Sequence, residues 1–172
     1  MPASAIEIRA MVPEDAQRVL AIYQAGIETG HATFESVAPD WPAFDGKYLP
    51  ECRLVATMGR EVVGWIALTP VSRRPVYRGV AEHSIYISAN ARGQGVGRKL
   101  LEALVSASER AGFWTLQTSI FPENEASIRL HEAYGFRVLG RRERIARMTY
   151  GPMEGQWRDT VIMERRSATA GS

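Results

Sequence analysis

Residues 82–101 read EHSIYISANARGQGVGRKLL, and this segment indicates more about the fold than any other in the chain. Polar and apolar residues alternate over 81–87, which predicts a strand, and apolar residues recur at helical spacing after residue 96. Between these segments Gly93, Gly95 and Gly97 leave a strand-to-helix turn without side chains. Backbone N–H groups at the start of a helix can converge on an anion, so the segment predicts a pyrophosphate-binding turn.

Two common phosphate-binding turns do not fit this spacing. A dinucleotide-binding turn has the pattern G-x-G-x-x-G, whereas the three glycines here give G-x-G-x-G. The strand expected at 115–120 also ends without an acidic residue that could bind a ribose. A P-loop requires G-K-S or G-K-T, but Arg98 follows the last glycine.

The turn instead resembles the acetyl-coenzyme A loop of the GNAT superfamily of N-acetyltransferases, whose pattern is Arg/Gln-x-x-Gly-x-Gly/Ala. Arg92, Gly95 and Gly97 match this pattern in place. A side chain at Gly95 or Gly97 is expected to fill the space where the backbone approaches the pyrophosphate. The alternative is a flexible glycine turn before a surface helix.

A second segment, NEASIRLHEAYGF at 124–136, is similar to a later signature of the same superfamily, Asn-x-x-Ala/Ser-x-x-Leu-Tyr-x-x-x-Gly-Phe. Its residues predict a short helix with Asn124 as the N-cap and Gly135 as the left-handed stop. An ordinary capped helix would show the same features. His131 stands where the superfamily pattern has a tyrosine.

The resemblance narrows to the phosphinothricin and methionine-sulfoximine acetyltransferase family. The matching segments, besides His131, are IETG at 27–30 followed by Phe34-Glu35, AEHSIYI at 81–87 and QWRD at 156–159. The resemblance implies a small amino acid as substrate, acetyl-CoA as cosubstrate and no metal. Because members of this family are commonly dimers, it also implies a homodimer.

The chain has 172 residues, of which 45% are hydrophobic, and this is enough for one well-packed core. We expect a single domain over residues 1–166 and a flexible tail at 167–172. The elements expected along the chain follow the order β-α-β-β-β-α-β-α-β-β. This order predicts an α/β (α+β) fold with a mixed, mostly antiparallel central sheet and helices on both faces, and it matches the GNAT fold.

Composition argues against several classes of partner. A net charge of +2 is too small to indicate nucleic-acid binding, and the basic cluster at 141–147 is expected to be a solvated loop or an interface. The single cysteine, Cys52, cannot form an internal disulfide and is expected to be structural. The first residues lack the pattern of a signal peptide, and no apolar run is long enough to cross a membrane. We therefore expect a cytoplasmic protein with no membrane partner.

Acetyl transfer from a thioester to an amine requires a fixed acyl carrier, a proton acceptor, a stabilised oxyanion and a departing thiolate. The family resemblance implies that the glycine turn binds the pyrophosphate. It also implies that the end of the central strand binds the pantetheine and the thioester carbonyl. The residues expected to bind the cofactor are Ile85, Tyr86, Ile87, Arg92, Gly93, Gln94, Gly95, Val96, Gly97, Arg98, Asn124 and Ser127.

Glu82 is the expected catalytic base. Strand alternation places it on one face with Ser84 and Tyr86, and partial burial or a relaying water would make it a better base. The alternative is an ion pair with a nearby arginine of the 70–79 loop. His131 is the expected acid for the leaving thiolate, with Tyr134 as the substitute; a bystander role for His131 stays open.

Substrate recognition is expected from the 70–79 loop and from the cleft. Arg73 and Arg74 can clamp a carboxylate, and together with Ser72 they align with the substrate loop of the resembled family. Charges facing solvent are the alternative for both arginines. The other expected substrate contacts are Phe34, Glu82, His83 and Ser84.

Two other functions are consistent with the same fold, namely a protein N-terminal or lysine acetyltransferase and a non-catalytic acyl-CoA-binding module. The long aromatic segment at 29–45 favours a closed pocket over an open peptide groove, and an intact Glu82 disfavours a non-catalytic module. The sequence leaves open which amino acid is the substrate and which of Arg73 and Arg74 contacts it.

Overall fold

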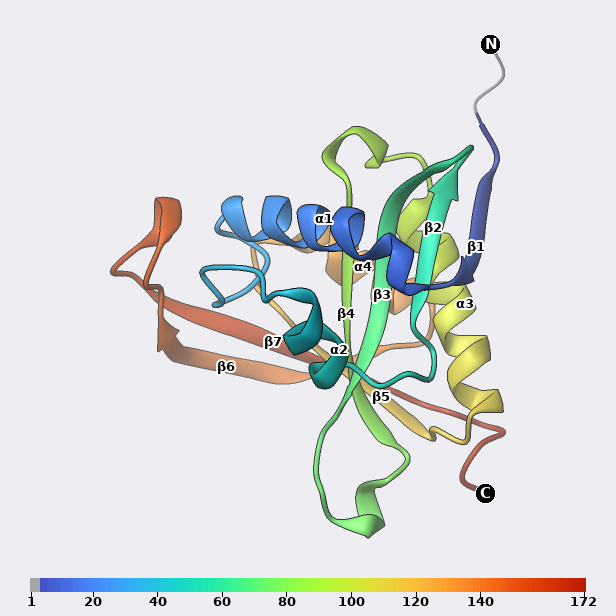
Figure 1. Cartoon of the computed structure of the whole chain (residues 1–172). Helices are drawn as coiled ribbons and strands as arrows, with labels where there is room; N and C mark the ends of the chain where they lie inside the picture. The colour runs from blue at the N-terminus through green and yellow to red at the C-terminus, as the bar shows by residue number, and fades with distance from the viewer. Residues whose placement is uncertain (1–3) are drawn as a thin grey trace.

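A seven-stranded sheet with the order β1-β2-β3-β4-β5-β7-β6 forms the centre of the computed structural model, which describes residues 4–172 (Figure 1). Only β4 and β5 pair in parallel, and all other neighbouring strands are antiparallel. The expected mixed, mostly antiparallel sheet is confirmed. The strands are β1 (Ile6–Ala10), β2 (Leu54–Met58), β3 (Glu61–Pro70), β4 (Val80–Ile87), β5 (Thr115–Ile120), β6 (Arg137–Arg147) and β7 (Trp157–Arg166).

Four α-helices cover the two faces of the sheet, α1 and α2 on one and α3 and α4 on the other (Figure 1). Their bounds are α1 (Ala16–Glu28), α2 (Trp41–Lys47), α3 (Val96–Arg110) and α4 (Glu125–Ala133). Short 3-10 helices are η1 (Pro13–Asp15), η2 (Pro75–Tyr77), η3 (Ala89–Ala91) and η4 (Gly151–Met153). None of the helices of residues 4–172 has both the length and the apolar character needed to cross a membrane.

Each face of the sheet has its own apolar core. Val19, Tyr23 and Ile27 project from α1 at helical spacing and pack, with Phe44 of α2, around Trp65 of β3. On the other face, three leucines of α3 pack against the inner strands, and all three are fully buried: Leu100, Leu101 and Leu104. Helical periodicity in the sequence therefore corresponds directly to the two buried faces.

The basic cluster at 141–147 was expected to be a solvated loop or an interface; it lies on a strand, so the loop alternative was wrong, and the interface alternative stays a prediction. β6 extends from Arg137 to Arg147 and pairs with β7 along this length as a long antiparallel hairpin, visible at the left of Figure 1. Nearly every side chain of β6 is exposed because it is an edge strand, so the apolar alternation that marks a strand in sequence is missing.

The C-terminal residues 167–172 are tied to the domain by hydrogen bonds. Ser167 is buried and donates from its hydroxyl to Glu109 at 2.8 Å. The guanidinium of Arg166 donates to the carbonyls of Ala170 and Gly171, each at 2.8 Å. These hydrogen bonds join the segment to the domain, and its expected flexibility stays a prediction.

The parallel pairing of β4 and β5 is short, and this positions the candidate site. It spans three residue pairs, from Val80↔Thr115 to Glu82↔Gln117, after which the two strands separate. β4 nevertheless stays paired with β3 as far as Ile87. One side of β4 therefore faces a gap where a neighbouring strand would otherwise lie.

Candidate active site

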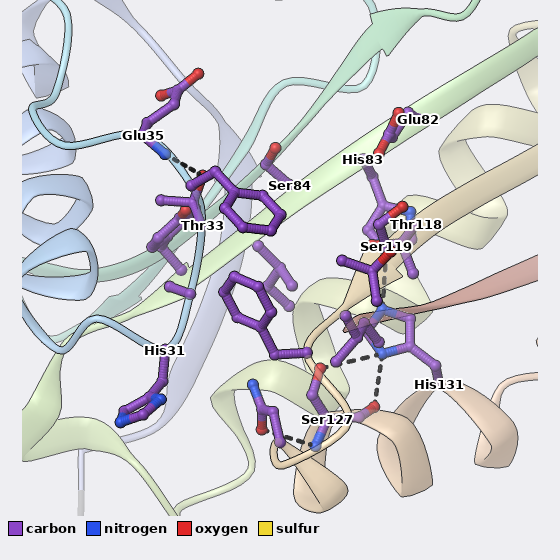
Figure 2. Close-up of a pocket in the computed structure, with 18 of the residues that line it drawn as sticks. His31, Thr33, Glu35, Glu82, His83, Ser84, Thr118, Ser119, Ser127 and His131 are labelled. Atoms are coloured by element: carbon purple, nitrogen blue, oxygen red, sulfur yellow. Dashed lines mark hydrogen bonds between the residues drawn. The ribbon is translucent and has the colours of Figure 1, made fainter. Parts of the chain in front are cut away.

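A cleft of about 410 Å³ occupies the gap between β4 and β5 (Figure 2). Residues 82–86 of β4 and 118–121, from the end of β5, line its sides. The segment 31–35 between α1 and α2 closes it from one direction, and α4 together with β6 contributes the remaining wall. Single residues of α1, α2 and β7 also line it, so the cleft collects side chains from eight parts of the chain.

The backbone of β4 offers unpaired polar groups to this cleft. The N–H of Ser88 donates to the carbonyl of Val63 on β3 at 2.8 Å. Because backbone groups alternate along a strand, Ser84 and Tyr86 also direct theirs toward β3. The backbone N–H and C=O groups of Ile85 and Ile87 then point to the opposite side, where β5 has separated. Among residues 4–172 no strand pairs with β4 on that side beyond Glu82, so these groups are free to bind a ligand.

The glycine turn lies between the end of β4 and the start of α3. Gly95 is the N-cap of α3 with φ 89°, and Gly93 has φ 74°, conformations that favour glycine strongly. A Cβ at either position would meet no atom within 4 Å, so the outer surface of the turn is open. Arg92 and Arg98 flank this turn and are exposed. The turn, the helix N-terminus and the two cations together suit a phosphate-bearing ligand.

Gly97 serves a purpose that differs from the expected one. It lies inside α3, and a Cβ there would come within 2.9 Å of the side chain of Ile87 and 3.1 Å of Leu130. The absence of a side chain lets α3 approach β4 and α4 closely. The requirement for glycine at this position is therefore one of packing between elements, in addition to any contact with a ligand.

Glu82 lines the cleft and is half-buried. Its carboxylate forms no ion pair or hydrogen bond with another of residues 4–172, so the alternative ion pair with a loop arginine is not observed; only its backbone carbonyl accepts, from the Thr69 hydroxyl at 3.4 Å. Arg74 instead lies over the ring of Tyr77, and Arg78 lies over Trp114. Ser84, on the same face as Glu82, accepts a hydrogen bond from the Tyr48 hydroxyl at 3.2 Å.

His83 and His131 form a buried pair in the wall of the cleft. Their Nε2 atoms are 2.8 Å apart, and the two residues are 3% and 1% exposed. The Nδ1 of His131 lies 2.7 Å from the carbonyl of Ser127, which requires an N–H on that nitrogen. His131 Nε2 then accepts from His83 Nε2–H, and His83 Nδ1 has no partner among residues 4–172. Burial lowers the pKa of both imidazoles, so the pair is neutral.

This pairing bears on the roles expected for both histidines. In the neutral pair each nitrogen of His131 is engaged within the protein, so no N–H of His131 is free to protonate a thiolate. The ring of His83 is directed toward α4, but His83 and His131 are both among the residues that line the cleft, so a substrate contact of His83 stays a prediction. Tyr134, the substitute acid, packs against the apolar core and is not one of the cleft-lining residues.

Asn124 and Ser127 line the cleft as expected. The Asn124 side chain accepts from the N–H of Ser127 at 3.3 Å, which caps α4 as the sequence predicted. Phe34 also lines the cleft and packs edge-on against Phe121 with ring centroids 5.1 Å apart. Ser72, Arg73 and Arg74 lie in the loop between β3 and β4 and do not line the cleft.

Several cleft residues carry no local sequence signal. Lys47 of α2 forms a 2.8 Å ion pair with Glu35, which also accepts a hydrogen bond from the Tyr23 hydroxyl. Burial raises the pKa of Glu35, but the hydrogen bonds from Lys47 and Tyr23 more than offset this and leave it below its ordinary value. On the opposite wall Arg142 and Thr160 come from β6 and β7.

Among residues 4–172, no three His, Cys, Asp or Glu side chains are grouped to hold a metal ion.

Known proteins share both the sequence and the architecture. The Acetyltransferase (GNAT) family model matches residues 21–136. A phosphinothricin N-acetyltransferase of Alcaligenes faecalis is 33% identical over 171 residues, which cover 94% of this chain and 82% of that protein. An L-methionine sulfoximine/L-methionine sulfone acetyltransferase of Salmonella typhimurium is 30% identical over 85% of this chain, and the match covers 63% of that protein.

Solved structures give the same result. A GNAT superfamily phosphinothricin acetyltransferase from Sinorhizobium meliloti, in complex with AcCoA, superposes with a TM-score of 0.83 at 28% identity, covering 96% of this chain and 90% of that one. A ribosomal-protein-alanine N-acetyltransferase from Brucella melitensis has a TM-score of 0.80 at 29% identity, covering 94% and 99%. The separated strands, the glycine turn and these matches lead to one conclusion: the chain belongs to the GNAT family of acetyltransferases.

Proposed function

We propose that this acetyltransferase transfers the acetyl group of acetyl-CoA to the α-amine of a small free amino acid such as phosphinothricin, methionine sulfoximine or methionine sulfone. The observation that carries the proposal is a bounded cleft of about 410 Å³ with Glu82 on its wall. Relatives whose names specify these substrates match 85–94% of the chain. A cleft of this size suits a small metabolite.

The cofactor would enter along the open side of β4. The glycine turn and the N-terminus of α3 would hold its pyrophosphate, with Arg92 and Arg98 adding charge. Backbone groups of Ile85 and Ile87 would bind the pantetheine amides and the thioester carbonyl. Asn124 and Ser127 border the other edge of the cleft.

The chemistry follows from the position of Glu82. An amino acid's ammonium group must lose a proton before its nitrogen can attack, and Glu82 would accept that proton directly or through a water. A C–N bond then forms at the thioester carbon, and a backbone N–H of β4 stabilises the oxyanion. The C–S bond breaks, and the thiolate leaves and takes up a proton. His131 could donate this proton only after its pairing with His83 opens.

The closed wall of the cleft supports a free amino acid over a peptide. Residues 31–35 are fixed by a 2.7 Å hydrogen bond from the Tyr150 hydroxyl to the Thr33 carbonyl. At the start of the same segment Arg158, which is buried, donates to the Gly30 carbonyl at 2.7 Å. The edge-on packing of Phe34 on Phe121 closes the cleft further. A peptide would have to displace this wall.

The test is a substrate panel with acetyl-CoA and a thiol-release readout. We expect rapid turnover of phosphinothricin, methionine sulfoximine or methionine sulfone and little turnover of peptides with free N-termini or lysines. Faster turnover of the peptides would replace the proposal with a protein acetyltransferase. Binding of acetyl-CoA without turnover of any amine would indicate a non-catalytic module.

We also infer a cytoplasmic homodimer. A lone cysteine, Cys52, fits a reducing compartment. Four large apolar side chains on β6 and β7 are about half exposed, which favours a second copy covering them: Val138, Leu139, Ile145 and Trp157. Light scattering coupled to size-exclusion chromatography tests the oligomeric state, and a mass of 19.1 kDa would show a monomer.

A further inference from the structure

Five of the residues of β6 are arginines. The side chains of four of them contact other residues of the β6–β7 hairpin, and the fifth is directed to the cleft. Arg137 pairs with Glu164, Arg141 pairs with Asp159, and Arg147 donates to the Gly155 carbonyl. Arg144 lies over the ring of Trp157. The side chain of Arg142 has no hydrogen bond or ion pair with any other residue of 4–172, and Arg142 is the β6 arginine that lines the cleft.

A β-bulge explains why Arg142 faces the cleft. The β6–β7 register shifts between Arg142 and Ala146, so three residues of β6 lie opposite Asp159 alone. Arg144, inside the bulge, has φ 48°, a conformation uncommon for a residue with a side chain. Bulges next to active sites re-aim side chains, and this one follows directly after Arg142.

Asp159 holds this bulge with both carboxylate oxygens. Oδ1 accepts the backbone N–H of Arg144 at 2.7 Å, and Oδ2 accepts Nε–H of Arg141, also at 2.7 Å. The Arg141 side chain is thereby held on the same face of the β6–β7 hairpin as Asp159. The next residue, Arg142, lies on the opposite face together with Thr160, its partner on β7.

The surroundings of Arg142 suit an oxyanion. Thr160 is 7% exposed, and its hydroxyl has no hydrogen-bond partner among residues 4–172, although it lines the cleft. A buried polar group without a partner is costly, so a ligand that accepts its hydrogen bond is favoured. Ser119 on β5 lines the cleft as well and is exposed. A carboxylate here would accept from the guanidinium and from the Thr160 hydroxyl.

The charges of the cleft match a zwitterion. Four formally charged side chains line it, two of each sign. Glu35 and Lys47 neutralise each other across 2.8 Å. This leaves one carboxylate, Glu82, and one guanidinium, Arg142, and these two do not form an ion pair with each other. An α-amino acid carries an ammonium and a carboxylate, the complement of this remaining pair.

We propose that Arg142 binds the α-carboxylate of the amino-acid substrate and that Asp159 is a positioning residue that aims Arg142 into the cleft. The inference rests on the proposed function and deepens it by naming the specificity-determining residue. We expected Arg73 or Arg74 of the 70–79 loop to bind the carboxylate, but both lie outside the cleft. The inference assigns this role to Arg142 instead.

The first test compares Arg142→Gln with Arg137→Gln, which removes an exposed arginine of the same strand. We expect Arg142→Gln to raise KM for the amino acid about 10- to 150-fold, the range for losing a charge-assisted hydrogen bond. KM for acetyl-CoA should stay within about twofold. Arg137→Gln should change neither constant, and Arg142→Lys should recover part of the loss. An amino-acid KM for Arg142→Gln equal to that of the wild type would overturn the inference.

A second substrate distinguishes recognition of the carboxylate from recognition of the amino-acid side chain. An amine that lacks the carboxylate but keeps the side chain should be equally poor with the wild type and with Arg142→Gln. If Arg142→Gln impairs this amine as much as it impairs the amino acid, Arg142 reads another group and the inference fails. Failure of the proposed function has a different signature, because the wild type would then turn over no free amino acid.

The second test addresses Asp159. Asp159→Asn should raise KM for the amino acid with little change in kcat, because it loosens the bulge and leaves Glu82 in place. If Asp159 acts through Arg142, the double variant Asp159→Asn/Arg142→Gln should have the KM of Arg142→Gln alone. Additive effects on KM would show that Asp159 does not act by positioning Arg142. A general loss of folding is checked by titrating each variant with acetyl-CoA, whose affinity should be unchanged.

Discussion

Glu82 and Glu35 are both carboxylates of the cleft, but their environments suit them to different roles. Lys47 and Tyr23 bind the oxygens of Glu35 and keep its pKa below its ordinary value despite burial. Those oxygens are already occupied. Glu82 has no such partners among residues 4–172, so its lone pairs can accept a proton from an amine or a bridging water. The proposal that Glu82 is the base therefore rests on which carboxylate is left unpaired.

The replacement Glu82→Gln keeps the shape of the side chain and removes the proton acceptor. We expect kcat to fall roughly 10²- to 10⁴-fold, the usual range for a positioned general base, with the affinity for acetyl-CoA nearly unchanged. Steady-state kinetics and calorimetric titration measure the two quantities. Glu132→Gln, at an exposed position of α4, is the matched control and should behave as the wild type. A Glu82→Gln enzyme that keeps a third of wild-type kcat would show that Glu82 is structural.

The histidine pair makes stability depend on pH in a defined window. Burial lowers the pKa of both His83 and His131, so the folded protein binds fewer protons than the unfolded chain below an unfolded pKa of about 6.5. The stabilisation is therefore present above pH 6.5 and is lost as the pH falls below it. With two groups, the free energy of unfolding can change by up to about 2.7 kcal/mol per pH unit.

Urea unfolding between pH 5 and pH 8 checks this expectation. The carboxylates whose pKa values are lowered, such as Asp15 and Asp159, titrate below this window and do not obscure it. His83→Asn should be less stable than the wild type at pH 8 and should show a smaller loss between pH 6.5 and pH 5. Equal slopes for both proteins would mean that His83 does not bind protons differentially.

At the scale of elements, the junction between β4 and α3 combines two separate uses of glycine. Gly95 supplies a left-handed N-cap in open surroundings, whereas Gly97 supplies room for Ile87 and Leu130. The first use shapes the turn that would face the pyrophosphate. The second sets the distance of α3 from its neighbours. A substitution at Gly95 should therefore impair mainly cofactor binding, and a substitution at Gly97 mainly the packing of α3.

We expect Gly95→Ala to weaken acetyl-CoA binding, with strain at a positive φ lowering stability by about 1–2 kcal/mol. Gly97→Val should act mainly on the fold, since overpacking typically costs about 1–3 kcal/mol. Denaturant titration and calorimetry separate the two effects. Gly46→Ala is the control, because Gly46 lies within α2 and a Cβ there meets no atom within 4 Å. A fully stable Gly97→Val enzyme would contradict the packing role of Gly97.

Elements marked by consecutive residues were predictable from the sequence, and those that depend on distant partners were not. Asn124 caps α4 and Gly135 ends it with φ 86°, as the local pattern indicated. β6 was assigned in part to a loop because an exposed edge strand shows no apolar alternation. The place of Arg142 in the cleft depends on a bulge held by Asp159, and no rule for neighbouring residues reveals that contact.

At the scale of the whole molecule, the candidate site lies where two antiparallel halves meet. Strands β1 to β4 form one half, and β5, β7 and β6 form the other (Figure 1). Only the three residue pairs of β4 and β5 join them within the sheet. A ligand in the cleft would contact both halves at once, so binding should stabilise the molecule as a whole.

We therefore expect acetyl-CoA to raise the free energy of unfolding by about 2.7 kcal/mol at a concentration 100 times its dissociation constant, through mass action. Denaturant unfolding with and without the ligand measures this shift. Gly95→Ala, assayed at the same ligand concentration, should show a smaller shift because its affinity is lower. An unfolding curve that acetyl-CoA leaves unchanged would contradict binding to the folded state.

The short parallel pairing also has a mechanical consequence. Strands β1 and β7, which lie nearest the two chain ends, belong to different halves (Figure 1). A force applied to the ends must cross the seam between β4 and β5, and parallel pairs are slightly less stable per residue than antiparallel ones. Under load the sheet should tear there first, with each half still intact. A cosubstrate that fills the gap would contact both halves and hold them together, so the rupture force should rise when acetyl-CoA is bound.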